Sequence, residues 1–400
     1  MPQSQNNDTI ELTCDQVRDM TVDTLIKHLN FVVHGHRYNT QDIWNVAVAA
    51  SAQCQAIESA ANQLADAPAP STVRSHIRKG LVNMMALGTL EDSLNQALIS
   101  HLPPSIHGKW HKIAMDLTHI PYYGEAAVNS SELCRGKAKS GTTHFHCYAT
   151  AYVIKKNKRI TLAFTYVQSA DTLTGILKRL LARLRMLKVH LKRLYLDKEF
   201  YCVPVISYFQ IHYPDQQVII PAVIRGKQGG TRALLRGNKS YHTTYTMRSQ
   251  KYGEATFGMG VVRKYSKGRY SRNGVKWFAY ALLGNIRSPL PPLHHIYEEY
   301  RLRFGIESTY RLMNKVRART SSQSPGLRLL FVGIALSLVN IWVFLKWAYV
   351  SYPRRGGRDV QEDLFPLTMF RQFLLESIKA IYGAVRSISL PMMAPTENKT

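Results

Sequence analysis

The chain has 400 residues, among them 52 Lys or Arg and 26 Asp or Glu, which gives a formal net charge of +26. This excess of basic residues argues against an enzyme of small metabolites and favours a polyanionic partner, with nucleic acid as the first expectation. A protein that is basic on a membrane-facing side is the alternative. The five cysteines form no CxxC pair and no signal peptide precedes them. We therefore expect the protein to be located in the reducing cytoplasm, in association with the nucleoid.

The first part of the chain, residues 1–105, is predicted to be a helical domain. Apolar residues recur at helical spacing near residue 25, and residues 43–64 are rich in alanine. A proline-rich turn at 67–70 precedes Ser71, a candidate N-cap for a helix over 72–81. This helix carries the basic residues Arg74, Arg78 and Lys79. A turn followed by a short basic helix is typical of a helix-turn-helix, so we expect these side chains to contact DNA, although many such helices only pack.

A strand is predicted over residues 112–123. Its alternation places Asp116 as a lone acid among apolar residues. A buried, unpaired carboxylate is costly, so Asp116 is expected to meet a cation, a metal ion or the edge of a cleft. Hydrogen bonds from backbone amides at a strand end are the structural alternative.

Further strands and helices follow in the order β-β-β-α-β-α-β. Two β-rich runs, 145–154 and 160–167, flank a basic tip at 155–159 and precede an amphipathic helix. The next strand, 190–196, ends at Asp197, and Lys198 follows it. Open α/β sheets place their chemistry at the carboxyl ends of strands, so Asp197 is a second candidate acid.

Residues 226–285 are rich in Thr, Tyr, Val and Gly and contain three predicted strands, at 241–248, 256–264 and 275–283. We expect a β-rich insertion domain here.

Residues 300–315 are predicted to form one helix. At about 100° per residue, Glu307 and Arg311 each lie within about 20° of Tyr300, with Arg303 about 60° aside. Glu307 would thus share a face with two arginines. The plain alternative is a surface helix with i,i+4 ion pairs.

Residues 329–345 form an apolar stretch of the length of a short membrane span. A helix buried on all sides in a large core has the same composition, and we favour that interpretation. The remainder, 351–400, is predicted to be a helical tail with an amphipathic helix at 365–385.

These features resemble a DDE transposase of a prokaryotic insertion sequence. In the IS-four group of these enzymes the third acid lies in a Tyr-x2-Arg-x3-Glu-x6-Lys helix, and Tyr300, Arg303 and Glu307 match it at the required spacing. The last position is Asn314, with Lys315 one residue later. Asp197-Lys198-x-Phe200 also suits the resemblance, which covers about residues 112–345.

The resemblance implies an α/β fold with a ribonuclease H-like catalytic core, formed by 106–225 and 286–350. The β-rich insertion 226–285, the helical domain 1–105 and the tail 351–400 complete it. It also implies that Asp116, Asp197 and Glu307 hold two Mg²⁺ ions, or Mn²⁺, for cleavage at transposon ends and strand transfer into target DNA. Three converging carboxylates repel one another unless a cation joins them.

The expected partners are double-stranded DNA, both the terminal inverted repeats and the target, and a second copy of the chain in the synaptic complex. A membrane partner is not expected. By resemblance, the DNA contacts come from Tyr300 and Arg303 and, more weakly, from Arg311, Lys315 and Lys198. Two other interpretations stay open: a catalytically inactive, transposase-derived DNA-binding protein, and a membrane-associated basic protein organised by 329–345.

Overall fold

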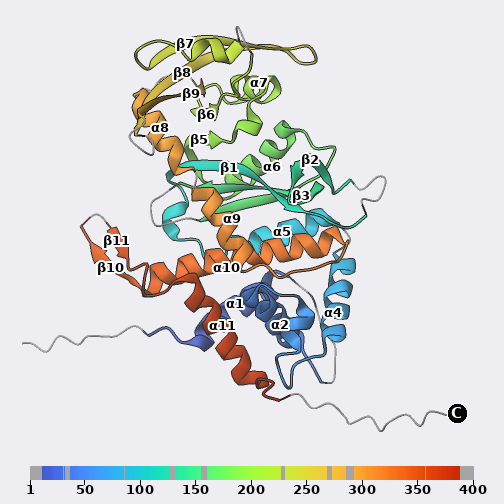
Figure 1. Ribbon diagram of the computed structural model, residues 1–400. Helices are drawn as coiled ribbons and strands as arrows, with labels where there is room; N and C mark the ends of the chain where they lie inside the picture. The colour runs from blue at the N-terminus through green and yellow to red at the C-terminus, as the bar shows by residue number, and fades with distance from the viewer. Residues whose placement is uncertain are drawn as a thin grey trace, which may run out of the picture.

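The computed structural model describes residues 11–29, 31, 37–84, 86–125, 131–154, 160–226, 230–267, 273–284, 292–303, 305–355 and 357–387. In Figure 1 a central sheet lies above the long helix α10, with helices from both ends of the chain beneath it and a group of strands at the top. The basic tip expected at 155–159 lies outside the described residues.

The N-terminal part is helical, as predicted. It contains α1 (Cys14–His28), α2 (Thr40–Gln53), α3 (Ile57–Ala61), α4 (Pro70–Asn83) and α5 (Leu87–Ile99), followed by the short η1 (Pro104–Ile106). The alanine-rich run is not one helix, because Cys54 takes a left-handed conformation that ends α2. Helix α4 begins earlier than predicted: Pro70 opens it, and Ser71 is not the N-cap.

The central sheet carries the two candidate aspartates. Its first strands are β1 (Trp110–Pro121), β2 (Cys134–Lys139), β3 (Thr142–Val153), β4 (Thr161–Val167), β5 (His190–Leu196) and β6 (Val218–Pro221). Spatially the order is β2-β3-β1-β5-β6, with β4 paired to β3. Strands β1, β5 and β6 are parallel, whereas β1, β3 and β4 pair antiparallel.

The predicted strands and helices are present in the predicted order, with one additional strand, β2. Helix α6 (Leu173–Met186) follows β4, and η2 (Lys198–Phe200) and α7 (Val203–His212) follow β5. Strand β2 was not predicted. Its sequence, CRGKAK, has no buried face to produce an alternating pattern, and most of its residues are exposed.

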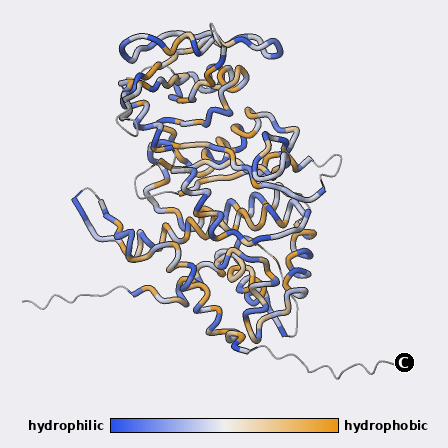
Figure 2. The backbone as a smooth tube through the Cα atoms, in the orientation of Figure 1, coloured by the Kyte–Doolittle hydropathy of each residue, from blue (hydrophilic) through white to orange (hydrophobic). Residues whose placement is uncertain are grey.

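The β-rich segment continues the same sheet. After η3 (Gly230–Leu234) come β7 (Tyr241–Ser249), β8 (Gly253–Lys267) and β9 (Asn273–Leu283), which confirm the three predicted strands. Strand β9 pairs with β6, so hydrogen bonds join this segment directly to the core sheet. In Figure 2 hydrophilic colours mark the ends of the outermost strand, β7, and hydrophobic colours gather in the central layers.

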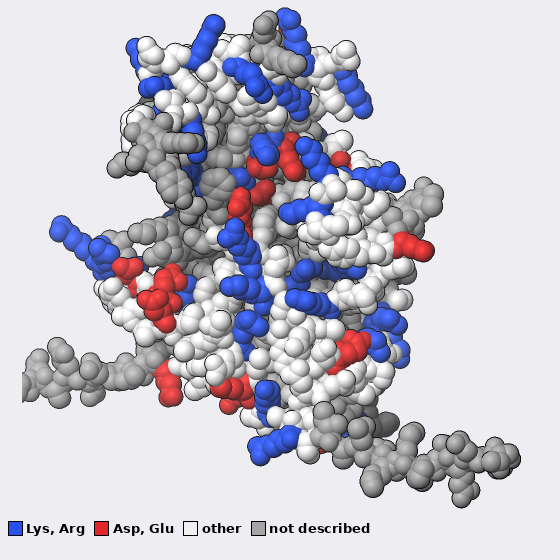
Figure 3. Space-filling view, viewed as in Figure 1, with Lys and Arg blue, Asp and Glu red and all other residues white. Residues whose placement is uncertain are grey.

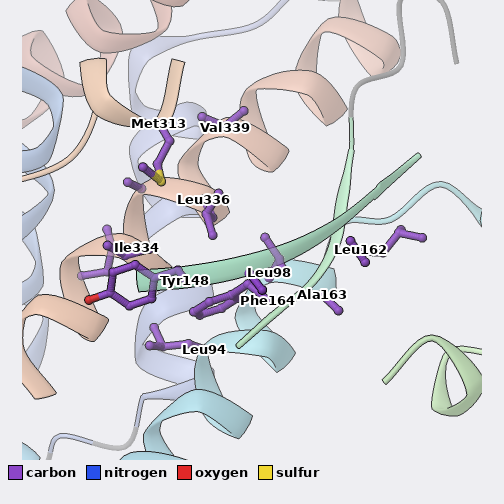
Figure 4. Packing of buried hydrophobic residues seen from close by; sticks show 14 of the residues in the cluster. Leu94, Leu98, Tyr148, Leu162, Ala163, Phe164, Met313, Ile334, Leu336 and Val339 are labelled. Carbon is purple, nitrogen blue, oxygen red and sulfur yellow. The ribbon is translucent and has the colours of Figure 1, made fainter. Parts of the chain in front are cut away.

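The apolar stretch forms the middle of α10 (Pro325–Tyr349), a core helix. It is long and apolar enough to cross a membrane, but 94% of its most apolar window is buried within the protein. In Figure 4, Ile334, Leu336 and Val339 lie among side chains from neighbouring elements, including Leu94 and Phe164. The contact with α5 is close: a Cβ on Gly333 would come within 2.6 Å of the Leu94 side chain.

Asn340 provides polar contacts inside this apolar layer. Its amide nitrogen donates to the carbonyls of Thr161 and Leu98, at 2.8 and 2.9 Å. Its amide oxygen accepts from the backbone N–H of Thr161 at 3.1 Å. One side chain thus fixes α10 against both β4 and α5.

The C-terminal part returns to the N-terminal helices. After the hairpin of β10 (Ser351–Arg354) and β11 (Gly357–Val360), α11 (Leu367–Tyr382) packs on α1 and α2. Ser377 donates to Asp15 at 2.5 Å, and the Tyr382 hydroxyl donates to Asp42 at 2.6 Å. Helices from the two ends of the chain therefore form one helical layer (Figure 1).

We predict that Asn340→Leu lowers the free energy of unfolding by at least about 1–3 kcal/mol, because it leaves the buried polar groups of Thr161 and Leu98 without partners. Urea unfolding measures this loss. Leu338→Met, a change of similar volume on the same buried helix, is the control and should cost less than about 1.5 kcal/mol. An Asn340→Leu chain as stable as wild type would contradict the core role of Asn340.

Candidate active site

The predicted helix over 300–315 is wrong as a single element. Two helices occupy the segment, α8 (Leu293–Leu302) and α9 (Gly305–Lys315). At the break, the backbone N–H of Arg303 donates to the carbonyl of Tyr300 at 2.9 Å, a tight i−3 bond that closes the last turn of α8. Tyr300 and Glu307 therefore do not share one helical face.

Asp116 and Asp197 meet at one edge of the sheet, and we call them the acid pair. Asp116 lies in β1, Asp197 follows β5, and the parallel register pairs Met115 with Leu196, the residues just before each aspartate. Arg303 joins the two carboxylates. One guanidinium nitrogen lies 2.9 Å from Asp116 Oδ2 and the other lies 3.0 Å from Asp197 Oδ1. The expectation that Asp116 meets a cation is therefore fulfilled by an arginine.

Burial dominates the electrostatics of Asp116. It raises the pKa of the Asp116 carboxyl to about 7, although Arg303 acts to lower that pKa; nearby Asp197 raises it further. The backbone N–H of Leu117 also donates to Asp116 Oδ1 at 2.9 Å. One cation therefore does not offset both the loss of water and the neighbouring carboxylate.

Arg303 shows the opposite balance. Burial lowers the pKa of its guanidinium, but Tyr300, Asp116, Asp197 and Glu307 together raise it above the usual value. At Arg303 the groups that raise the pKa outweigh burial, because several of them act on one cation. At Asp116 burial prevails, because only one cation lies beside the carboxylate. Arg303 is 5% exposed and stays charged.

Glu307 lies in the first turn of α9, exposed to solvent. Its charge is among those that raise the pKa of Arg303. Within the described ranges, no group of three or more His, Cys, Asp or Glu is placed to hold a metal ion. The structure thus brings Asp116 and Asp197 together on one guanidinium, with Glu307 outside that contact.

Two tyrosines hold α8 and α9 on the strands of the acid pair. The Tyr300 hydroxyl donates to the carbonyl of Leu196 at 3.1 Å, just before Asp197. The Tyr310 hydroxyl donates to the backbone carbonyl of Asp116 at 3.0 Å. Burial raises the pKa of both hydroxyls, so both remain protonated donors. The resemblance implied DNA contact for Tyr300, which lies buried here.

Glu299 anchors α8 beside this site, a role that the sequence did not indicate. Its carboxylate accepts from Lys112 Nζ at 2.6 Å, from the Tyr195 hydroxyl at 2.5 Å and from Arg193. Burial raises the pKa of Glu299, but these donors outweigh it and the pKa falls below its usual value. The residue before Tyr300 is thus an ionised anchor to β1 and β5.

The other basic candidates lie on the surface. Lys198, Arg311 and Lys315 are exposed, as are Arg78 and Lys79 of α4. Arg74 forms an ion pair with Glu58 of α3. In Figure 3, Lys and Arg side chains gather below a small acidic patch and spread over the face between α9 and α4. A basic surface thus adjoins the candidate site.

Solved structures that resemble this chain include a piggyBac transposase, determined by cryo-electron microscopy in a synaptic complex with hairpin DNA. The alignment covers 92% of this chain and 77% of that chain, with a TM-score of 0.52 and 10% sequence identity. The chain shares its fold with a DNA transposase. This transposase-like fold is a mixed α/β fold with a large central sheet, and its strand order is consistent with a ribonuclease H-like arrangement.

Other comparisons add little to this likeness. The Argonaute of Marinitoga piezophila, in complex with guide RNA and target DNA, aligns over 75% of this chain and 36% of its own at 12% identity, with a TM-score of only 0.22. No protein-family profile matches the sequence, and no curated protein sequence matches it. The likeness to the transposase is therefore one of fold.

The raised pKa of Asp116 predicts a pH-dependent stability in the presence of EDTA. The folded chain binds a proton at Asp116 up to about pH 7, whereas the unfolded carboxyl loses it near pH 4. Wild-type stability should therefore fall as pH rises through this window, by up to about 1.4 kcal/mol per unit of pKa difference, and level off above pH 7.

The Asp116→Asn variant lacks this titrating group. The difference in free energy of unfolding between the variant and wild type should therefore change between pH 5 and 7. Loss of the contact with Arg303 displaces the whole curve but adds no slope in this range. Urea unfolding at several pH values gives both curves. Parallel curves would show that Asp116 titrates normally.

Proposed function

We propose that this chain is a transposase that cleaves DNA strands and transfers them, using the acid pair and Glu307 as a DDE-type centre. The observation that supports this most directly is the convergence of Asp116 and Asp197. They come from neighbouring parallel strands, at the carboxyl edge of the sheet, and point to one cationic group. The fold likeness to a DNA transposase agrees with the proposal.

The residues at this edge fit a divalent cation. Two carboxylates share one positive group, and oxygen ligands of this kind suit Mg²⁺ or Mn²⁺. Asp116, Asp197 and Glu307 would hold the metal. When bound, it would supply an activated water or 3′-hydroxyl and stabilise the leaving oxygen at phosphorus.

Arg303 has a second role in this proposal. Its guanidinium lies between the carboxylates that would hold the metal, so the two cations compete for the same oxygens. Arginine binds phosphate oxygens in the same forked geometry as carboxylates. We propose that Arg303 exchanges the acid pair for a DNA phosphate as substrate enters, which leaves the carboxylates free to hold metal.

The DNA substrate is proposed from charge and position. The net charge of +26 favours a polyanion, and Lys198, which follows Asp197, is exposed, as are Arg311 and Lys315 of α9. We propose terminal inverted repeats and target DNA as the partners, a homodimer to pair two ends, membership of the IS-four group, and a cytoplasmic, nucleoid-associated location.

A second candidate function is DNA binding without catalysis. The specific observation in its favour is that Arg303 takes both carboxylates while Glu307 stays outside their contact. Such a chain would bind duplex DNA but not cut it.

We predict that the wild-type chain nicks DNA containing the sequences that flank its own coding region, in Mg²⁺ or Mn²⁺. Asp116→Asn, Asp197→Asn and Glu307→Gln should each reduce cleavage by at least about a hundredfold, since each removes a charged metal ligand. Gel analysis of end-labelled DNA measures the cleavage.

Two controls belong with this assay. Glu298→Gln changes an exposed acid of α8 that pairs with Lys264 and should leave cleavage unchanged. Electrophoretic mobility shifts show whether each variant still binds DNA. Equal cleavage by the wild type and the three site variants would refute the catalytic assignment, and binding without cleavage by wild type would favour the second candidate.

Competition between Arg303 and the metal predicts a thermal shift. Arg303→Gln should unfold at a lower temperature in EDTA, because two neighbouring carboxylates lose their cation, and should gain more from Mg²⁺ than wild type does. A ligand at a hundredfold excess over its dissociation constant adds about 2.7 kcal/mol to native stability. Arg301→Gln, which alters an exposed arginine paired with Glu298, is the control. If both variants gain no more than wild type from Mg²⁺, Arg303 does not occupy the metal position.

A further inference from the structure

A polar crevice of about 210 Å³ lies between α3, α4 and the linker of residues 316–324, which joins α9 to α10. Its polar wall comes from α4 and the linker: Arg74, Arg78, Arg319, Thr320, Ser321 and Ser322. Ile77 and Phe331 are among the apolar residues that line it. Three guanidinium groups and three hydroxyl groups therefore border one small space.

The crevice has an excess of positive charge. Glu58 is the acid that lines it, and Glu58 pairs with Arg74. Within the part of the chain that the structure describes, Arg78 and Arg319 form no ion pair. Two exposed cations therefore face the crevice without an anionic partner.

Two further arginines, Arg317 in the linker and Arg328 in α10, add positive charge to this region. Burial lowers the pKa of Arg317, and the nearby cations Arg328 and Arg319 lower it further. Burial also lowers the pKa of Arg328. Two arginines therefore act on the half-buried Arg317, which is unfavourable unless an anion lies nearby.

The linker is held in place by its own contacts. The backbone N–H of Arg319 donates to the carbonyl of Gln55 at 3.0 Å, which ties the linker to the N-terminal helices. The Arg328 guanidinium donates to the carbonyl of Ser322 at 2.8 Å. The arginine and hydroxyl side chains are thus presented from a fixed backbone, which reduces the entropy lost when a ligand binds.

The position of the crevice suggests its ligand. Helix α9 carries Glu307 in its first turn and Lys315 at its end, a rise of about 12 Å, and the linker continues from there past the crevice that it shares with α4. That rise corresponds to roughly three to four base pairs at 3.4 Å each. Figure 3 shows Lys and Arg side chains over this same face. Arginine and serine or threonine side chains are usual phosphate contacts in DNA complexes.

We propose that the crevice between α4 and the 316–324 linker is a phosphate-binding site for the DNA strand that passes from the acid pair to the N-terminal helices. The ligand is a backbone phosphodiester held jointly by Arg78 and Arg319. The inference rests on the proposed function, because it takes DNA as the substrate, but it does not depend on catalysis. It gives the linker a role in joining DNA binding to the candidate active site.

The test is duplex binding in EDTA, where no metal-dependent cleavage occurs. A fluorescently labelled 30-base-pair duplex is titrated with wild type, Arg78→Gln and Arg319→Gln at several salt concentrations, and anisotropy gives the dissociation constant. Each variant should bind roughly tenfold or more weakly. The slope of the logarithm of the affinity against the logarithm of salt should fall in magnitude by about one.

Arg355→Gln is the matched control, since Arg355 is an exposed arginine at the turn between β10 and β11 and its loss changes net charge equally. A larger loss of duplex affinity in Arg78→Gln and Arg319→Gln than in the control supports the phosphate-binding site. Losses no greater than the control overturn it, whatever the cleavage assay shows.

The double variant tests whether the two arginines share one phosphate. If they do, Arg78→Gln with Arg319→Gln should lose less than the two single losses combined. Additive losses would overturn the shared site. A wild-type chain that binds the duplex but never cuts it leaves this inference intact and refutes only the proposed catalysis, whereas a wild type that binds no duplex refutes both.

Discussion

The guanidinium of Arg303 connects two strands and two helices at one point. Its nitrogens bind one carboxylate within β1 and one directly after β5, and its backbone closes the last turn of α8 just before α9 begins. Two carboxylates about 4 Å apart repel by roughly 4 kcal/mol at an effective dielectric constant near 20, so this edge of the sheet requires a cation. The chain provides one from its own sequence. The pairing adds to the tyrosine and Glu299 contacts that hold α8 and α9 over the sheet.

Contacts around the acid pair make its geometry rigid. The Tyr300 hydroxyl binds the carbonyl of the residue before Asp197, and the Tyr310 hydroxyl binds the carbonyl of Asp116 itself. Glu299 fixes α8 to both strands through Lys112 and Arg193. Tyr300 and Tyr310 are buried, Glu299 is half-buried, and all three are hydrogen-bonded, so a shift of either helix would break several hydrogen bonds at once. Glu307 differs because it stands exposed at the start of α9. The sheet positions two acids firmly and leaves the third on the more accessible element.

The sequence predicted the core strands because they contain runs of consecutive buried β-branched and aromatic residues. It also located Asp116 within one strand and Asp197 at the end of another, and the fold brings the two together. It missed the break between α8 and α9, since helical periodicity continues through the break and a single Gly305 costs a helix only about 1 kcal/mol. It also missed the partners of Glu299 and Arg303. Lys112 and Arg193 are more than a hundred positions from Glu299, and only the folded sheet determines that they meet.

Helix α11 carries a consequence for synthesis of the chain. It packs on α1 and α2 and donates hydrogen bonds to Asp15 and Asp42, more than three hundred positions earlier. Helices α1 and α2 therefore leave the ribosome long before α11, which completes their layer, although domains usually fold as they emerge. A product shortened before α11 would leave the apolar side of α1 and α2 uncovered. Chains that terminate before α11 should therefore compete poorly with the full-length protein, because α1 and α2 lack the helix that packs on them.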